Sequence, residues 1–380
     1  MRILHIAGVR YSKQLKRSIA GGISNSVPKL AEAQLKRVNS VGIITIKKSD
    51  NPLSRKIYWE SAADRSFIDL MLNDPFERVI NEFGLPDIIH THDIYEIKIL
   101  PFIYHAAKHN IKIYSSPRGN LSPLALSRKK LKKILYLKYF FSFFEKKIHA
   151  FVALNSGEKR NISKRYKKKK IITISNGVEN NDFFLKKFRD NYKLKQNSSK
   201  IKIGFIGRYE VHIKGLDLLM EGFINYQNQT DKNLIKLILI GDHSKKTRSE
   251  KYFEEIEKKI NYKQNYALKS PHFNEEKFEQ LSCFDIFVHT SRTEGMPNAV
   301  LEAISMGIPC LVTPQTNMGK IIKEANCGWV INPCTDDIMN FFLSIENVSK
   351  KELYEKGQNG IKYAKKYLEW ERVAAREFYE

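Results

Sequence analysis

Two acidic residues flank a glycine-proline turn in the stretch Arg292-Thr-Glu-Gly-Met-Pro-Asn-Ala-Val-Leu-Glu302. The stretch follows an apolar run and leads into a helical pattern. A helix that begins after such a turn directs backbone N–H groups, here those of Asn298 and Ala299, and the positive end of its dipole toward one point. This arrangement binds phosphate, so we expect a diphosphate here.

Glu294 precedes this helix, and Glu302 lies about one and a half turns inside it. A carboxylate in the second position can accept hydrogen bonds from the vicinal hydroxyls of a ribose, as the acidic residue of dinucleotide sites does. The pattern therefore indicates a nucleotide site. The alternative interpretation is a capped helix with two solvated acids.

Two basic residues, each next to a glycine, lie upstream of this stretch. Gly207-Arg208 ends the apolar run 201–206, and Lys214-Gly215 comes before a helical pattern. Two fixed cations can stabilise the charge that grows on a leaving diphosphate, which is otherwise the work of a metal ion. Taken alone, an Arg and a Lys at such positions would more often be surface charges.

Together, these two motifs resemble the signature of the retaining glycosyltransferases of GT-B fold in family GT4. The resemblance implies that Arg208, Lys214 and Glu294 are catalytic, with the two cations on the donor diphosphate and Glu294 near the donor sugar. Glu302 would bind the ribose. The donor phosphate would lie against Gly295, Asn298 and Ala299. We expect no cofactor and no metal, because the nucleotide-sugar is a co-substrate and the chain contains no D-x-D sequence.

The N-terminal half carries weaker signals for the same site. Gly21 and Gly22 separate the first apolar run from a helical pattern, so the backbone there can approach a ligand closely. They resemble the family's glycine loop, which faces the diphosphate across the interdomain cleft. The turn at 176–179, Asn-Gly-Val-Glu, resembles the family's interdomain segment.

Two further residues are candidates for substrate binding. The loop 116–123 carries Arg118 where many family members have a sugar-contacting histidine. Its cation could meet an acceptor phosphate or an acidic sugar, or could be structural. His90 and His92 end an apolar run, and we expect their side chains on opposite faces of a strand, with His92 the better candidate for the cleft.

Apolar runs that alternate with helical patterns predict the elements that position these residues. Nearly continuous apolar strands separated by helices indicate parallel sheets covered on both faces. We therefore predict an α/β fold with two Rossmann-like, doubly wound domains facing each other across a cleft, with limits 1–175 and 176–355 and a helical segment 356–380 that packs back toward the first domain. Strands are expected at 2–8, 41–46, 87–92, 111–115, 151–154, 171–175, 201–206, 237–240, 286–289, 310–313 and 329–331.

The net charge of +24 is distributed unevenly. Residues 1–175 hold 34 Lys and Arg against 13 Asp and Glu, whereas residues 176–380 hold 31 against 28. The segment 128–170 alone has 16 basic residues, two acids and a cluster of six Tyr and Phe. This composition suits an anionic membrane surface, although the aromatic residues would equally suit a core-packed helix. We expect no nucleic acid partner, because no nucleic-acid-binding signature is present.

The expected activity is retaining transfer of a sugar from a nucleoside-diphosphate-sugar to a lipid-linked saccharide in the assembly of a bacterial surface polysaccharide such as lipopolysaccharide, O-antigen or capsule. The N-terminus lacks a secretory signal, so we expect a cytoplasmic protein on the inner face of the plasma membrane. The first alternative is a synthase of the same fold with a soluble sugar or sugar-phosphate acceptor. The remote alternative is a basic nucleic-acid-binding protein.

Overall fold

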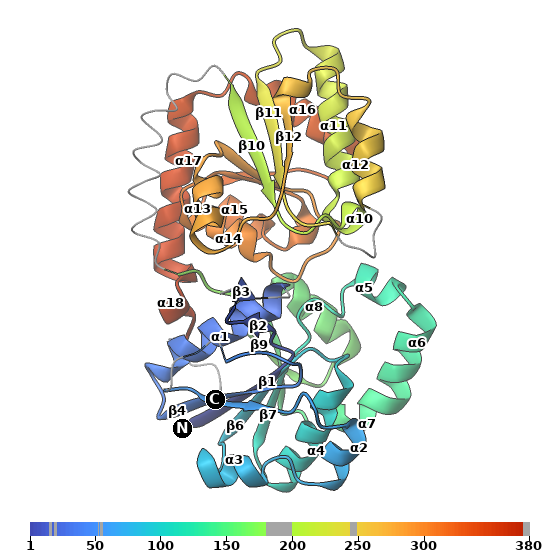
Figure 1. The fold of residues 1–380 in the computed structure, drawn as a ribbon, viewed down its shortest axis with the longest axis vertical. Helices are drawn as coiled ribbons and strands as arrows, with labels where there is room; N and C mark the ends of the chain where they lie inside the picture. The colour runs from blue at the N-terminus through green and yellow to red at the C-terminus, as the bar shows by residue number, and fades with distance from the viewer. Residues whose placement is uncertain are drawn as a thin grey trace. The chain divides into compact units, whose positions relative to one another are not determined.

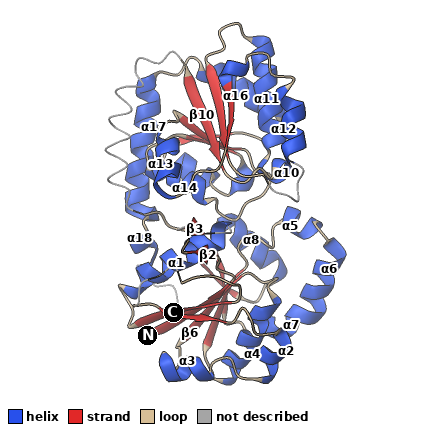
Figure 2. Ribbon diagram, in the orientation of Figure 1, coloured by secondary structure: helices blue, strands red, loops and turns tan. Residues whose placement is uncertain are grey.

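A computed structural model describes residues 1–14, 17–18, 21–51, 53, 56–179, 200–243 and 249–374. The chain divides into two compact units, which we call the N-terminal unit (Met1–Gly177 and the chain from Trp370 onward) and the C-terminal unit (Val178–Glu369). Each unit has a parallel sheet with helices on both faces (Figures 1 and 2). The predicted fold class, α/β with two Rossmann-like domains, is confirmed. The first unit boundary follows residue 177, where the sequence predicts 175, and the second follows residue 369, where the sequence predicts 355.

The sheet of the N-terminal unit has seven strands in the order β5-β4-β1-β6-β7-β8-β9, all parallel to their neighbours. This order reverses at β1, as in doubly wound folds. Its strands are β1 Arg2–Ala7, β4 Ser40–Thr45, β5 Tyr58–Ser61, β6 Ile88–His92, β7 Lys112–Ser116, β8 Ala150–Ala153 and β9 Lys170–Thr173, and the short strands β2 Tyr11–Ser12 and β3 Arg17–Ser18 pair separately.

Helices cover both faces of this sheet because alternate strand residues are apolar on either side. Ile3 packs in one hydrophobic cluster and its neighbour Leu4 in another. Trp370 and Val373 return from the end of the chain into the cluster of Ile3. The helical elements are α1 Gly21–Leu35, α2 Phe67–Leu72, α3 Glu77–Glu82, η1 Ile97–Ile99, α4 Leu100–Lys108, α5 Pro123–Ser127, α6 Lys130–Leu135, η2 Tyr136–Phe140, α7 Phe141–Glu145, α8 Ser156–Arg165 and α18 Trp370–Ala374.

The sheet of the C-terminal unit has six parallel strands in the order β12-β11-β10-β13-β14-β15. Its strands are β10 Ile201–Ile206, β11 Ile235–Ile240, β12 Tyr266–Lys269, β13 Ile286–His289, β14 Cys310–Val312 and β15 Gly328–Val330. Its helical elements are α10 Val211–Lys214, α11 Leu216–Gln229, α12 Ser249–Glu257, η3 Lys263–Asn265, α13 Asn274–Ser282, α14 Asn298–Ser305, η4 Pro314–Thr316, α15 Gly319–Glu324, α16 Thr335–Ile345, α17 Lys350–Tyr363 and η5 Ala364–Leu368.

The order of this sheet reverses at β10, so the loops after β10 and β13 leave from neighbouring strand ends. Ligands of open α/β sheets bind at such a switch point, beyond the carboxyl ends of the strands. No helix within the described ranges has the length and apolar composition that a bilayer span needs.

Candidate functional site

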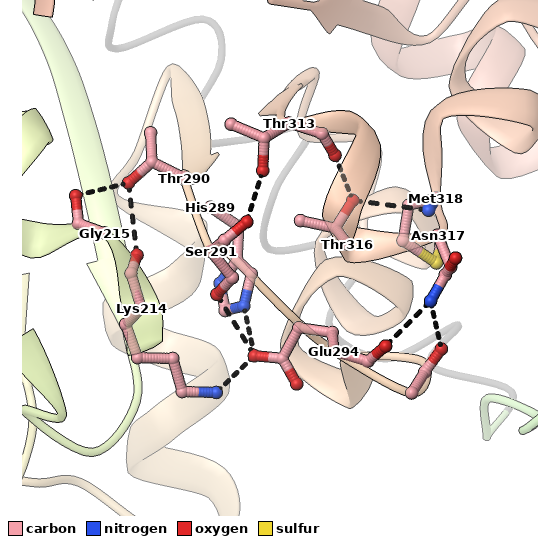
Figure 3. Close-up of polar contacts among 11 residues, drawn as sticks. Lys214, Gly215, His289, Thr290, Ser291, Glu294, Thr313, Thr316, Asn317 and Met318 are labelled. Atoms are coloured by element: carbon pink, nitrogen blue, oxygen red, sulfur yellow. Dashed lines mark hydrogen bonds and ion pairs between the residues drawn. The ribbon is translucent and has the colours of Figure 1, made fainter. Parts of the chain in front are cut away.

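The carboxylate of Glu294 is the centre of a compact polar cluster in the C-terminal unit (Figure 3). Its Oε1 accepts an ion-paired hydrogen bond from Lys214 and bonds of 3.1 Å from both His289 Nε2 and Ser291 Oγ. The other carboxylate oxygen points away from these donors (Figure 3). The structure therefore brings Glu294 and Lys214 together, as expected for two parts of one site.

The charge state of this cluster follows from its neighbours. Burial alone would raise the pKa of Glu294, but Lys214 and His289 together lower it well below its usual range, so the carboxylate stays ionised. Burial lowers the pKa of His289, which is therefore neutral and donates its Nε2–H to Glu294. Within the described residues, His289 Nδ1 is buried without a hydrogen-bond partner.

The position of Lys214 depends on the glycine that follows it. Gly215 ends α10 with φ of +63°, a left-handed conformation that side chains rarely adopt. A Cβ at this position would lie 2.1 Å from the carbonyl oxygen of Thr290, and the Thr290 hydroxyl donates back to the carbonyl of Gly215 at 3.0 Å. The Lys-Gly pair thus lets the α10 turn pack directly against the loop that carries Glu294.

Arg208 does not join this cluster. It follows β10, its side chain is 63% exposed, and its guanidinium lies 3.0 Å from Glu210. Another arginine, Arg292, braces the loop instead, with two bonds of 2.6 and 2.8 Å to the carboxylate of Asp217 on α11. A joint action of Arg208 and Lys214 on one ligand stays a prediction.

The second acid, Glu302, lies on α14 and is already paired. Its Oε1 accepts a bond of 2.6 Å from Lys277 on α13, and the side chains of both residues are largely buried. Sequence reasoning missed Lys277 because a lysine on a charged helix is ordinarily solvated. A ribose would therefore have to share Glu302 with this lysine.

A helix, α14, begins between the two acids and contains Glu302, and phosphate binding at its start stays a prediction. Pro297 precedes α14 and caps it without a side-chain hydrogen bond, and the first turn contains no acid that would offset the helix dipole. Asn298 and Ala299 are the first two residues of this helix, and Gly295 lies in the turn before it. The carbonyl groups of Glu294 and Gly295 accept bonds of 2.7 and 3.2 Å from Asn317.

In the N-terminal unit, a chain of hydrogen bonds ends at Arg118. Arginine can only donate, so its bonds of 3.0 and 3.3 Å to Nδ1 of His92 place the proton of His92 on Nε2. His92 Nε2 then donates to Nδ1 of His5 at 2.9 Å, and His5 Nε2 donates to Gln34 at 2.7 Å. Arg118 also donates to Asn176 at 2.8 Å, and its φ is +55°.

This network corrects the prediction for the histidine pair. His90 and His92 lie two residues apart in β6 and so share one face, where their rings are 4.1 Å apart; expecting them on opposite faces was wrong. Burial lowers the pKa of His5 to about 4 and keeps the pKa values of His90 and His92 well below the usual range. The three rings are therefore neutral near pH 7.

Ring nitrogens of His5, His90 and His92 lie within 4.8 Å of one another, a spacing that a metal ion can bridge. The hydrogen bonds to Gln34 and Arg118 account for two of these rings, and the third bonds Ser116 at 2.7 Å. The Arg118 cation beside His92 also opposes a second positive charge. We assign no metal to this cluster.

The remaining predicted residues of this unit lie at the start of α1. Gly21 and Gly22 are its first two residues, and among the residues that the structure describes a Cβ added to Gly22 would meet nothing within 4 Å. Their contact with a diphosphate stays a prediction.

One residue that sequence reasoning missed follows directly after β6. Asp93 has φ of +86°, and its Oδ1 accepts bonds from Asn120 at 2.7 Å and from the backbone N–H of Tyr95 at 2.9 Å. Burial raises the pKa of Asp93 to about 6. The sequence did contain a signal for Asp93, because an acid directly follows the apolar run 87–92.

Comparison with known proteins gives a family match for part of the chain. The model of the family "Glycosyl transferases group 1" matches residues 200–349. Protein CapJ of Staphylococcus aureus is 29% identical over 150 residues, which are 39% of this chain and 35% of that protein. An uncharacterized glycosyltransferase of Methanocaldococcus jannaschii is 28% identical over 251 residues, which are 62% of this chain and 57% of that protein.

Solved structures are similar over nearly the whole chain. HepE of Anabaena, solved in complex with UDP, has a TM-score of 0.71 at 12% identity, covering 98% of this chain and 97% of its own. A sucrose-phosphate synthase of Thermosynechococcus elongatus has a TM-score of 0.69 at 16% identity, covering 98% of this chain and 96% of its own. WaaG, a glycosyltransferase involved in lipopolysaccharide biosynthesis, has a TM-score of 0.66 at 14% identity, covering 96% of this chain and 95% of its own. At these identities the likeness is one of fold, and that fold is GT-B.

Proposed function

We propose that this chain is a retaining, metal-independent glycosyltransferase of the GT4 type that uses a nucleoside-diphosphate-sugar. The observation that carries the proposal is the cluster in which Lys214 and His289 hold the ionised Glu294 beside the start of α14. A fixed carboxylate, a buried lysine and a helix start without an acid are the parts that a sugar diphosphate needs.

Each part has a role in the proposed reaction. The N-terminus of α14, at Asn298 and Ala299, binds the phosphate nearer the sugar. Lys214, with Arg208, stabilises the charge that develops on the leaving nucleoside diphosphate, and this charge is greatest as the glycosidic bond breaks. One oxygen of Glu294 points away from its three donors (Figure 3), and we assign this oxygen to the contact with the sugar. Glu302 binds the ribose and shares its carboxylate with Lys277.

The retaining course follows if the acceptor hydroxyl attacks from the face that the nucleoside diphosphate leaves. The departing phosphate then takes the hydroxyl proton, and no protein nucleophile is required. Glu294 would be a poor nucleophile or base, because Lys214 and His289 keep its pKa well below the usual range. It suits the stabilisation of positive charge on the sugar ring well.

We propose a lipid-linked saccharide as the acceptor, in bacterial surface polysaccharide assembly at the cytoplasmic face of the membrane. The support is the likeness in fold to WaaG and the basic N-terminal unit. Arg118, fixed by His92 and Asn176, is the candidate cation for an acceptor phosphate. The segment 128–170 is the candidate contact with anionic lipid. The likeness to a sucrose-phosphate synthase favours a soluble sugar phosphate as the second candidate acceptor.

Calorimetry with nucleoside diphosphates tests the donor site. Glu302→Ala should weaken binding by roughly 1.5–3 kcal/mol, the cost of losing bonds to a charged acceptor, and the fold should remain intact. Lys277→Ala should not weaken binding, because it frees Glu302 for the ribose. An exposed acid of the same unit, changed in Glu355→Ala, serves as the control. Unchanged affinity in Glu302→Ala would remove this residue from the site.

Turnover assays then test the chemistry. Lys214→Ala should lower the rate by about 100-fold, as the removal of one electrostatic donor typically does, and transfer should persist in EDTA. Loss of activity in EDTA that Mg²⁺ restores would show that a metal is needed. Product formed from a soluble sugar phosphate but not from a lipid-linked saccharide would favour the second acceptor.

A further inference from the structure

Exposed large apolar side chains are concentrated in one part of the N-terminal unit. Of the thirteen in the described ranges, nine belong to α2, η1, α6, η2 and α7. We call these nine the apolar surface, and their exposed fractions lie between 40% and 77%. They are Ile68, Leu72, Ile97, Leu131, Ile134, Leu135, Tyr139, Phe140 and Phe143.

Contacts between the elements join these residues into one area. Phe67 of α2 packs its ring 6.1 Å from that of Phe140 in η2. The helix α4 contacts both α2 and α7, and its Tyr104 lies 6.4 Å from Phe143. In Figure 1, α2, α4 and α7 lie together and α6 continues beside them. The elements that carry these exposed apolar side chains are thus neighbours in the fold.

Part of this surface lies on a strongly basic segment. The segment 128–147 contains eight Lys and Arg and one acid, Glu145, which is paired with Lys169 at 3.3 Å. On α2, the carboxylate of Asp69 is paired with Arg65 at 2.6 Å. Glu145 and Asp69 are therefore each paired with a cation, while most of the cations of α6 and η2 are exposed.

The chemistry of the nine side chains selects among possible partners. Six are aliphatic and cannot stack on bases, which disfavours single-stranded nucleic acid. A second copy packed through the same face would bring the same cations together. An anionic bilayer offers both negative headgroups and an apolar layer beneath them.

We propose that the apolar surface inserts into the boundary between the headgroups and acyl chains of an anionic bilayer, with α2 entering beside α6 and α7. This inference rests on the membrane association in the proposed function. It adds an apolar contribution that salt does not screen. It also adds α2, which lies outside the basic segment 128–170.

Tryptophan reporters measure the insertion directly. The chain has three Trp, none of them in the apolar surface. In Ile68→Trp and Phe143→Trp, vesicles of anionic lipid with brominated acyl chains should quench the added fluorescence. Leu85→Trp is the matched control, because Leu85 is exposed on the same unit between α3 and β6, outside the surface. Its fluorescence should be quenched no more than that of the wild type.

Serine variants measure the contribution to binding. Leu72→Ser should lower partitioning into anionic vesicles by about tenfold or more, the scale expected when one leucine no longer leaves water. Leu85→Ser should leave it unchanged. Leu72 and Leu85 are 77% and 46% exposed, so neither change should unfold the protein.

The possible failures are distinguishable. Vesicle binding without quenching at position 68 would overturn the insertion of α2, and vesicle binding without quenching at either position would leave a purely Coulombic membrane association. No vesicle binding by the wild type would overturn both membrane proposals, whereas nucleoside diphosphate binding would still support the donor site. Dimerisation that Leu72→Ser abolishes would assign the surface to a second copy of the chain.

Discussion

At the scale of single residues, the candidate site depends on partners that share no motif with the residues they hold. Lys214 and Glu294 are eighty positions apart, and Lys277 and Glu302 are twenty-five apart. The motifs identified both members of the first contact and only Glu302 of the second, and His289 was counted only as the last residue of a strand. Its signal was present, because a histidine at the carboxyl end of a strand before the Glu294 loop is placed to face the ligand.

His289 provides a test of how Glu294 is positioned. In His289→Phe, the ring can keep its stacking on Phe205, which lies 5.6 Å away, but it loses the Nε2–H bond to Glu294. Turnover should fall roughly 10–100-fold, since bonds to charged groups contribute about 1.5–3 kcal/mol. Thermal stability should be maintained or raised, because the buried and unpaired Nδ1 is removed.

His289→Gln should recover part of the turnover, because its amide can donate to Glu294. As a control, His149→Phe changes an exposed histidine of the N-terminal unit and should leave turnover unaltered. Wild-type turnover in His289→Phe would show that Lys214 and Ser291 hold Glu294 without help.

Asp93 predicts a pH-dependent stability. Burial raises its folded pKa to about 6 from 3.8, so the folded state holds the proton more tightly than the unfolded state does. The destabilisation is absent below about pH 4, grows as the pH rises and is complete above about pH 6. Since each pKa unit corresponds to about 1.4 kcal/mol, the full destabilisation amounts to about 3 kcal/mol.

Urea unfolding at two pH values measures this effect. Asp93→Asn should raise the free energy of unfolding at pH 7 by up to that amount and should lose the advantage near pH 4. The exposed Asp231→Asn should change stability little at either pH. Equal effects of Asp93→Asn at both pH values would mean that the carboxyl does not ionise at a cost in the folded protein.

At the scale of elements, the sequence predicted the interior of both sheets and one edge of each, β9 and β15, and missed the opposite edge. All eleven predicted strands are present, because central parallel strands are apolar on both faces and are easily recognised. The missed strands β5 and β12 lie at the ends of their sheets. Each is partly exposed, so polar residues interrupt the apolar runs that would identify them.

The basic aromatic segment shows why local pattern could not decide burial. The core-packed interpretation holds for Phe141 and Phe144, which are buried, whereas Tyr139 and Phe143 are exposed and their contact with a membrane stays a prediction. A π-helical turn at 136–140 shifts the helical phase between these residues. A regular 3.6-residue period cannot anticipate such a shift.

At the scale of the whole molecule, the uneven distribution of charge along the sequence corresponds to the division into two units. The excess cations belong to one unit, and the proposed donor site lies in the other. Membrane attachment and donor binding should therefore be separable by mutation. This separation gives the proposal its sharpest test, because one property can be removed while the other is measured.

Replacing Lys129, Lys130 and Lys132 with Gln should weaken binding to anionic vesicles by up to about 3 kcal/mol, since each charge near the surface contributes about 1 kcal/mol. These side chains are exposed. Lys133 is left intact because it donates to the carbonyl of Ala125. Wild-type binding should weaken in the same way as salt shortens the Debye length from about 10 Å at 0.1 M to 3 Å at 1 M.

The matched control changes three exposed lysines of the C-terminal unit, in Lys251, Lys258 and Lys259→Gln, and so alters the net charge equally. Nucleoside diphosphate affinity should be the same in both triple variants, because neither touches the Glu294 cluster. Transfer to a lipid-linked acceptor should fall only in the first. Equal losses of vesicle binding in the two variants would mean that total charge, and not the segment 128–147, drives the attraction, because a local docking surface must distinguish between the two sets of lysines.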